Sequence, residues 1–118
     1  MAAPGLGQRG EEQAARYLRL RGYRILERNY RCRFGEIDLI ARRGRYLVFV
    51  EVKQRHDARF AEAREFVTLL KQARVLAAAQ HYLAENESDL QPRFDVMEVY
   101  GGEDGRPRIV HLENAFGE

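Results

Sequence analysis

Hydrophobic and polar positions recur along this chain with two different spacings, and the change of spacing marks its elements. Apolar residues three or four positions apart predict helices, whereas short apolar runs predict strands. We expect a helix, a strand, a two-stranded hairpin, a second helix and two further strands, over residues 8–21, 23–29, 36–53, 65–85, 94–100 and 108–112. Residues 54–65 lack a strand pattern and are expected to form a loop. This α-β-β-β-α-β-β order predicts a single α/β domain over residues 1–118, with a mixed five-stranded sheet flanked by helices.

Three charged residues interrupt the apolar pattern of the hairpin at residues 36–53. Asp38 lies within one apolar strand, and Glu51 and Lys53 end the next. Ionised groups in an apolar setting are costly unless they are paired or bind a metal. The three residues therefore predict a metal site with a reacting group, and metal-assisted phosphodiester hydrolysis as its chemistry. A simple Glu–Lys ion pair at the end of a sheet is the alternative.

The loop of this hairpin sets the register of its strands. A four-residue loop over residues 42–45 is expected, which places Asp38 opposite Phe49. Asp38 and Glu51 are then diagonal neighbours on one face, with Cα atoms about 7–8 Å apart. Both carboxylates would reach one hard cation. Lys53 shares that face, since it is two residues beyond Glu51.

A third carboxylate is predicted near this pair. Glu11 precedes Ala14, Ala15 and Leu18 at helical spacing, so it lies on the core-facing stripe of the first helix. From the N-terminal end of that stripe, its side chain would reach over the edge of the sheet toward a metal. A favourable interaction with the helix N-terminus is the alternative.

Charge is distributed unevenly along the chain. The net charge is only +2, but residues 1–55 hold 13 Lys and Arg against 6 Asp and Glu, whereas residues 56–118 hold 7 against 12. The basic excess lies in the same half as the candidate site. A basic rim of this kind predicts a phosphate-rich polymer as the partner. Solvated surface arginines are the alternative.

Composition excludes several other classes of protein. No apolar run approaches 18 residues, and no basic stretch followed by an apolar core begins the chain, so neither a membrane span nor a secretory signal is expected. The single cysteine, Cys32, excludes an internal disulfide and a cysteine-rich zinc site. It suits a reducing compartment, and we expect a cytoplasmic protein.

Several motifs of the chain resemble those of one known family. They are Gly10-Glu11, Tyr17-Leu18, the segments 22–26 and 29–31, Gly35-Glu-Ile-Asp-Leu-Ile, Phe49-Val-Glu-Val-Lys, Phe94-Asp-Val and Asn114-Ala-Phe. Together they resemble the YraN-like family of small bacterial proteins over nearly the whole chain. That family is described as uncharacterised and is grouped by fold with the PD-(D/E)xK nucleases, akin to archaeal Holliday-junction resolvases. The resemblance implies a restriction-endonuclease-like core.

The resemblance also implies roles for single residues. Asp38, Glu51 and Lys53 would be catalytic, and Glu11, Asp38, Glu51 and the carbonyl of Val52 would hold Mg²⁺ or Mn²⁺. Lys53 would orient the attacking water or stabilise negative charge on the phosphate. Phosphate contacts are expected from Arg31, Arg33, Arg55 and Lys71. Plain surface positions are the alternative for each of these four.

Three functions are compatible with the sequence. The leading hypothesis is a metal-dependent nuclease that acts on DNA rather than RNA, including branched or single-stranded DNA. The second is a nucleic-acid-binding module that keeps the fold without turnover, or that cuts only beside a partner. The third is a protein-interaction domain, which would show no salt-dependent affinity for nucleic acid. A homodimer is suggested only by the resemblance to resolvases.

Overall fold

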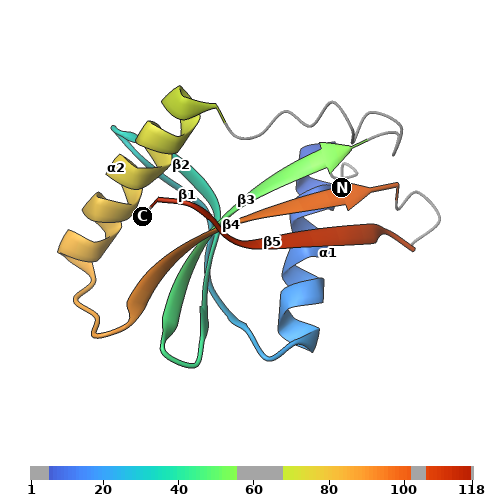
Figure 1. Ribbon diagram of the computed structural model, residues 1–118, viewed down its shortest axis with the longest axis horizontal. Helices are drawn as coiled ribbons and strands as arrows, with labels where there is room; N and C mark the ends of the chain where they lie inside the picture. The colour runs from blue at the N-terminus through green and yellow to red at the C-terminus, as the bar shows by residue number, and fades with distance from the viewer. Residues whose placement is uncertain (1–5, 56–67, 102–105, 118) are drawn as a thin grey trace, which may run out of the picture.

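The computed structural model describes residues 6–55, 68–101 and 106–117. They form α1 (Leu6–Leu20), β1 (Arg24–Cys32), β2 (Gly35–Arg43), β3 (Tyr46–Arg55), α2 (Leu69–Glu85), β4 (Gln91–Tyr100) and β5 (Arg108–Phe116) (Figure 1). The predicted α/β class and the order of elements are confirmed. Most of the loop expected at residues 54–65 lies outside the described residues. None of the described helices is long and apolar enough to cross a membrane.

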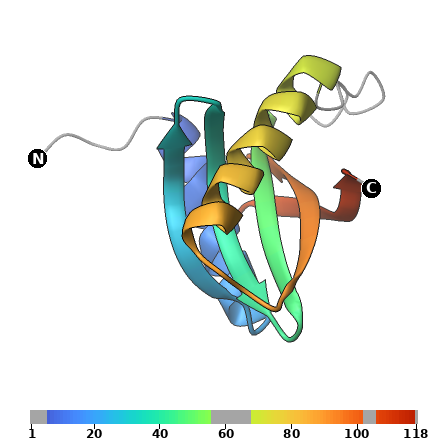
Figure 2. The ribbon, with the colours of Figure 1, turned by 90° about the vertical axis from the view of Figure 1, so that its left-hand side faces the viewer.

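The strands form one mixed sheet in the order β1-β2-β3-β4-β5. Neighbouring strands are antiparallel except β3 and β4, which run parallel. Parallel neighbours need a crossover connection, and α2 lies in the segment between these two strands. Figure 2 shows the strands curving between the two helices, with α2 on one face and α1 on the other.

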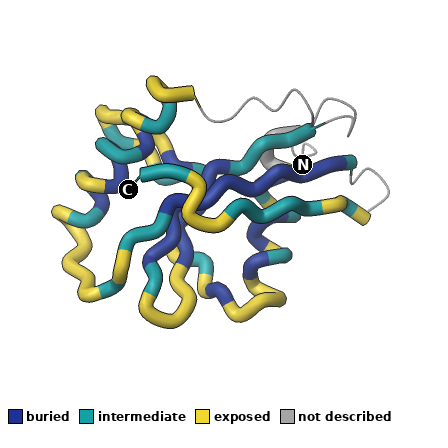
Figure 3. Tube along the Cα trace, in the orientation of Figure 1, coloured by how far each residue is buried: buried dark blue, intermediate teal, exposed yellow. Residues whose placement is uncertain are grey.

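Each helix buries a separate core against its own face of the sheet. Ala14, Ala15 and Leu18 of α1 are completely buried against the central strands, as the spacing of α1 predicted. On the other face, Val75 of α2 belongs to a second core that includes Phe49 of β3. Figure 3 shows that buried residues gather on the central strands, whereas the hairpin turns are exposed. The sheet is therefore a shared wall between two cores.

Local signals explain where the helices begin and end. Gly22 adopts a φ of +87°, and its N–H donates a hydrogen bond to the carbonyl of Arg19, which ends α1. α2 begins after Thr68, whose Oγ1 accepts a hydrogen bond from the N–H of Lys71. The sequence predicted an earlier start for this helix, but residues 65–67 lie outside the described part of the chain.

The first hairpin is tighter than the sequence predicted. β1 reaches Cys32, which pairs with Gly35, so only two residues connect β1 to β2. The predicted end of the first strand at residue 29 was therefore wrong, since β1 continues to Cys32. β1 is an edge strand and most of its residues are exposed, so its polar positions do not show the apolar pattern of a buried strand.

The second hairpin is also tighter. Arg43 pairs with Tyr46, so the loop between β2 and β3 has two residues where the sequence predicted four. Gly44 supplies the positive φ, +58°, that such a short loop requires. The two arginines before the loop belong to the strand although their side chains are exposed.

A buried acid joins β4, β5 and the start of β1. Asp95 is 0% exposed and accepts hydrogen bonds from Arg93 (2.9 and 2.8 Å) and from the N–H of Asn114 (3.0 Å). Its Oδ2 also lies 2.7 Å from Nε2 of His111, and Arg93 donates to the hydroxyl of Tyr23 (2.7 Å). Burial alone would raise the pKa of Asp95, but His111 and Arg93 outweigh it and lower that pKa. This network explains the Phe-Asp-Val and Asn-Ala-Phe motifs as structural.

Candidate functional site

Asp38 and Glu51 meet where the ladder between β2 and β3 ends. Its last pair is Leu39 with Val50, and Asp38 and Glu51 are the next residues on the two strands. The predicted register, with Asp38 opposite Phe49, was wrong by two residues because the loop is tighter. A shift of two leaves every side chain on its own face. The two carboxylates therefore still come together, as directly neighbouring positions rather than diagonal ones.

A backbone hydrogen bond holds Asp38 beside β3. Its Oδ2 accepts from the N–H of Val52 at 2.8 Å, beyond the last pair of the ladder. The N–H and C=O of one strand residue point toward the same neighbouring strand. The Val52 carbonyl is therefore directed to the side of Asp38.

Glu51 is buried without full compensation of its charge. Its side chain is 2% exposed, and Oε2 lies 3.4 Å from Nζ of Lys71. Among the described residues, no donor makes a hydrogen bond to its Oε1. Burial and repulsion by Asp38 raise the pKa of Glu51 to about 8, although Lys71 acts in the opposite direction. Burial also raises the pKa of Asp38, against the stabilising N–H of Val52.

Lys71 reaches this pair from the first turn of α2. The sequence predicted it as a phosphate contact, and the structure places its ammonium on Glu51. Burial lowers the pKa of Lys71, but the attraction of Glu51 and Asp38 is stronger, so that its pKa is raised. The side chain is 40% exposed and can therefore turn to solvent or to a ligand.

The alternation of faces along β2 is interrupted beside Asp38. Ile37 packs in the core under α2, whereas Leu39 packs in the core under α1, so strict alternation of faces is interrupted between them. On the neighbouring strand, Asn29 has a φ of +53°, which non-glycine residues rarely adopt. Asp38 lies at this interruption, and it interacts electrostatically with Glu11 of α1 and with Lys71 of α2.

Glu11 of α1 interacts electrostatically with Asp38. Burial and Asp38 raise the pKa of Glu11, while a hydrogen bond with Asn29 and the charge of Arg28 lower it less. The third predicted carboxylate is thus an electrostatic neighbour of Asp38. In residues 6–55, 68–101 and 106–117, however, no three Asp, Glu, His or Cys side chains lie close enough to hold a metal ion as they stand.

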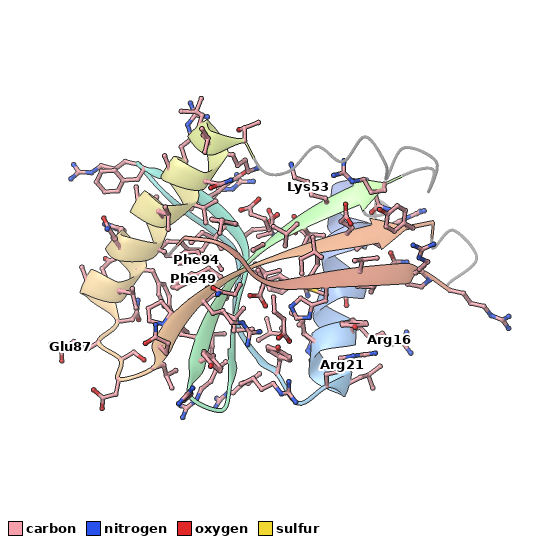
Figure 4. All side chains as sticks on the ribbon, viewed as in Figure 1. Arg16, Arg21, Phe49, Lys53, Glu87 and Phe94 are labelled. Carbon is pink, nitrogen blue, oxygen red and sulfur yellow. The ribbon has the colours of Figure 1, made fainter. Side chains whose placement is uncertain are left out.

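Lys53 extends the charged face along β3. Figure 4 shows it near the C-terminal end of the strand, far from Arg16 and Glu87. The parallel ladder sets Lys53 opposite Glu98 of β4, which is 2% exposed. Oε2 of Glu98 lies 3.4 Å from Nε of Arg55, so this predicted phosphate contact has an internal partner.

Glu98 is a residue of this face to which the sequence assigned no role. The signal was available, because Glu98 interrupts the apolar strand from Val96 to Tyr100. The same criterion had selected Asp38 and Glu51. Sequence position alone does not show whether such a buried acid lies beside Asp38 and Glu51 or beside Asp95.

A cleft adjoins the carboxylate pair between α2 and the first hairpin. Its volume is about 330 Å³, and its lining residues are Arg31, Cys32, Gly35, Glu36, Lys71, Arg74 and Val75. The predicted contact Arg33 lies at the adjacent turn, with its guanidinium 4.8 Å from the ring of Phe34. Among the residues that line the cleft, three are cations (Arg31, Lys71 and Arg74) and one is a carboxylate (Glu36).

The donor set of the pair suits a hard divalent cation. Mg²⁺ and Mn²⁺ prefer carboxylate, carbonyl and water oxygens. Buried polar atoms nearly always have hydrogen-bond partners. The unmatched Oε1 of Glu51 is therefore the observation that fits a cation best.

Comparison with known proteins extends over most of the chain. Residues 10–99 match a family described as "Uncharacterised protein family UPF0102". The "UPF0102 protein STH1475" of Symbiobacterium thermophilum is 51% identical over 112 residues, which cover 94% of this chain and 95% of the relative. The "UPF0102 protein NE0719" of Nitrosomonas europaea is 43% identical over 117 residues, 99% and 98% of the two chains. These matches confirm the resemblance drawn from the motifs, and neither name states an activity.

Proposed function

Because this chain belongs to the uncharacterised protein family UPF0102, its activity has to be argued from its site, and we propose that it is a metal-dependent nuclease that hydrolyses DNA phosphodiester bonds. Glu51 supports the proposal most directly. It is buried against Asp38, and one of its oxygens has no donor among the described residues. Strongly perturbed acids beside a cleft are typical of functional sites.

The chain's own residues have separate roles in this proposal. Asp38, Glu51, the Val52 carbonyl and Glu11 would hold Mg²⁺ or Mn²⁺, which when bound would stabilise charge on the phosphate and acidify water. The N–H of Val52 keeps Asp38 in place. Lys53 would orient the attacking water and stabilise negative charge on the phosphoryl oxygens.

Lys71 would change partners during binding. Its ammonium now compensates part of the charge of Glu51, and its side chain is 40% exposed. A divalent cation at the carboxylates would repel it. A phosphate oxygen in the adjoining cleft would then be its natural partner, because Lys71 lines both sites.

A nucleic-acid-binding module without turnover is the second candidate. The observation that favours it is the contact between Lys71 and Glu51, which neutralises one carboxylate without a metal. Such a module would bind DNA but would show no binding of Mn²⁺ that depends on Asp38. Isothermal titration of Mn²⁺ into the wild type and Asp38→Asn separates the two candidates.

Cleavage of single-stranded, duplex and branched DNA in Mn²⁺ tests the proposal. We expect Asp38→Asn and Glu51→Gln each to lower the rate by at least about 10²–10³-fold, because each removes charge from the proposed metal site. The Asn side chain can still accept from the N–H of Val52, so the fold should survive. Full activity in either variant would contradict the proposal.

Glu87→Gln provides the matched control for these substitutions. Glu87 is an exposed acid that follows α2, and Figure 4 shows it at the end of the molecule away from Lys53. The change is the same as in Glu51→Gln, so activity should be unaffected. An equal loss in Glu87→Gln would show that the cleavage comes from a contaminant or from a general charge effect.

A further inference from the structure

We infer that the cleft between α2 and the β1–β2 hairpin binds the backbone phosphate of the nucleotide next to the scissile one. This inference rests on the proposed function, since it assigns the scissile phosphate to Asp38 and Glu51. It adds a second binding site, with Arg74 as a residue that the sequence did not single out. The ligand class is a phosphodiester of a nucleic-acid strand.

The cleft is joined directly to the carboxylate pair. Lys71 lines the cleft, and its Nζ lies 3.4 Å from Oε2 of Glu51. One cation therefore borders both sites. A strand held at the carboxylates would place an adjacent phosphate in the cleft, because successive phosphates are joined through a single sugar.

The charges of the cleft favour an anion. Arg31, Lys71 and Arg74 are cations in its lining, and Glu36 is the acid there. Planar guanidinium groups bind phosphate through two parallel hydrogen bonds. With three cations to one acid, the cleft has an excess of positive charge for a phosphate.

Glu36 pairs with a cation that we assign to the phosphate, and a bound phosphate would replace it there. It pairs with Arg31 across β1 and β2, with Nε and Oε2 3.2 Å apart. The two side chains are 75% and 54% exposed, and ion pairs so exposed contribute little. A doubly hydrogen-bonded phosphate would therefore displace Glu36 from Arg31 at small cost.

The shape of the cleft depends on the close approach of the hairpin to α2. A Cβ on Gly35 would lie 3.1 Å from the backbone oxygen of Arg74 and 3.2 Å from its Cβ. Gly35 thus allows the strand to pack directly on the helix backbone beside Arg74. The volume of about 330 Å³ is near the lower limit of ligand pockets, which suits one nucleotide unit rather than a duplex.

Two substitutions with opposite expected effects on oligonucleotide affinity test this inference. Binding of a fluorescent single-stranded oligonucleotide is measured by anisotropy in EDTA, so that no cleavage occurs. Arg74→Ala should weaken binding about fivefold and lower the salt slope by about 0.7, as expected for one lost phosphate contact. Glu36→Gln should tighten binding about twofold to fivefold, because it removes the competing acid.

Arg16→Ala is the matched control for Arg74→Ala. Arg16 is also an exposed helical arginine, and Figure 4 shows it on α1, far from Lys53. Its loss should leave affinity and salt slope unchanged. Equal affinities for Arg74→Ala and Arg16→Ala, or weaker binding by Glu36→Gln, would overturn the inference.

Two further measurements separate the ligand sources and the two proposals. Inorganic phosphate at millimolar concentration should not displace the oligonucleotide; complete displacement would identify a free-phosphate site instead. Asp38→Asn should lose cleavage and keep the effects of Arg74→Ala and Glu36→Gln on binding. If Asp38→Asn cuts normally, the nuclease proposal fails; if only the binding effects are missing, the cleft inference fails alone.

Discussion

Two clusters in the same sheet bury carboxylates in opposite ways. Asp95 is completely buried, and its oxygens accept from Arg93 and Asn114 and pair with His111. Glu51 is buried just as well, but it faces a second acid, and one oxygen has no donor in the described residues. The pKa of Asp95 is lowered, whereas the pKa of Glu51 is raised to about 8.

This difference separates a structural acid from one that is ready to bind. Every oxygen of Asp95 is already used within the fold, so a ligand would gain nothing by approaching it. Asp38 and Glu51 repel each other when both are ionised, and binding of a proton or of a cation relieves that repulsion. The stability of the protein should therefore depend on the first cluster and its activity on the second.

The largest expected effect on stability comes from removal of Asp95. Asp95→Ala should lower the free energy of unfolding by about 3–5 kcal/mol, since it removes the closest carboxylate from buried Arg93. The side chains of Arg93 and His111 are only 11% and 8% exposed, so neither can be rehydrated in the folded state. Urea unfolding followed by circular dichroism measures the loss. A loss below about 1 kcal/mol would show that the network is not structural.

The opposite change in the free energy of unfolding is expected when Glu51 is replaced. Glu51→Gln should raise the free energy of unfolding at pH 7 by about 2 kcal/mol, because the raised pKa of Glu51, about 8, means that folding at pH 7 has to protonate it, a cost that the neutral amide does not have. Lys71 loses its partner but is 40% exposed and can turn to water. The same urea series without metal tests this. Destabilisation by Glu51→Gln would mean that the pair stabilises the fold and would remove the contrast with Asp95.

Sequence patterns predicted the pair of Asp38 and Glu51 better than they predicted the Asp95 network. Asp38, Glu51 and Glu11 were found because acids in apolar stripes violate local patterning, and that rule needs no tertiary information. Asp95 violates the same rule, yet its partner His111 lies on another strand, and its position could be known only from the β4–β5 register. Whether a buried acid is satisfied depends on such partners.

The fold shows the same limit. The order of elements followed from hydrophobic periodicity, but the two hairpin loops were placed too long. The ends of β1 and β2 carry exposed polar residues, whose strand conformation depends on pairing with a neighbour rather than on burial. The cleft beside Lys71 could not be foreseen either, because it forms between a hairpin and a helix far apart in the sequence.

Acid titration should sharpen the comparison. The folded pKa of Asp95 lies below its ordinary value of 3.8, so its contribution to stability is complete above that pH and is lost as pH falls through the folded pKa. Asp95→Asn lacks this titration. Its deficit relative to the wild type, about 1–2 kcal/mol near pH 6, should therefore shrink below pH 3.8. Urea unfolding of the wild type and Asp95→Asn at pH 6, 4 and 3 measures this deficit. A deficit that stays constant with pH would contradict the contribution of ionised Asp95 to stability.

The smallest expected change in stability tests whether the Asp95 network and the pair of Asp38 and Glu51 are independent of each other. Gly35 and Gly22 both have positive φ, +155° and +87°, so alanine at either position is strained by about 1–2 kcal/mol. Gly22 has no atom within 4 Å of an added Cβ, whereas at Gly35 that Cβ would press on Arg74 of α2. Gly35→Ala should therefore cost about 1 kcal/mol more than Gly22→Ala.

The shift of α2 in Gly35→Ala should also move Lys71 away from Glu51, while Asp95, whose hydrogen-bond partners among the described residues are Arg93, His111 and Asn114, keeps its geometry. NMR spectra can follow both sites, through the Lys71 amide and the ring of His111. We expect the Lys71 signal to shift and the His111 signals to stay in place. Movement of both signals would mean that the sheet transmits the strain, so that the acids of the two clusters could not be tuned separately.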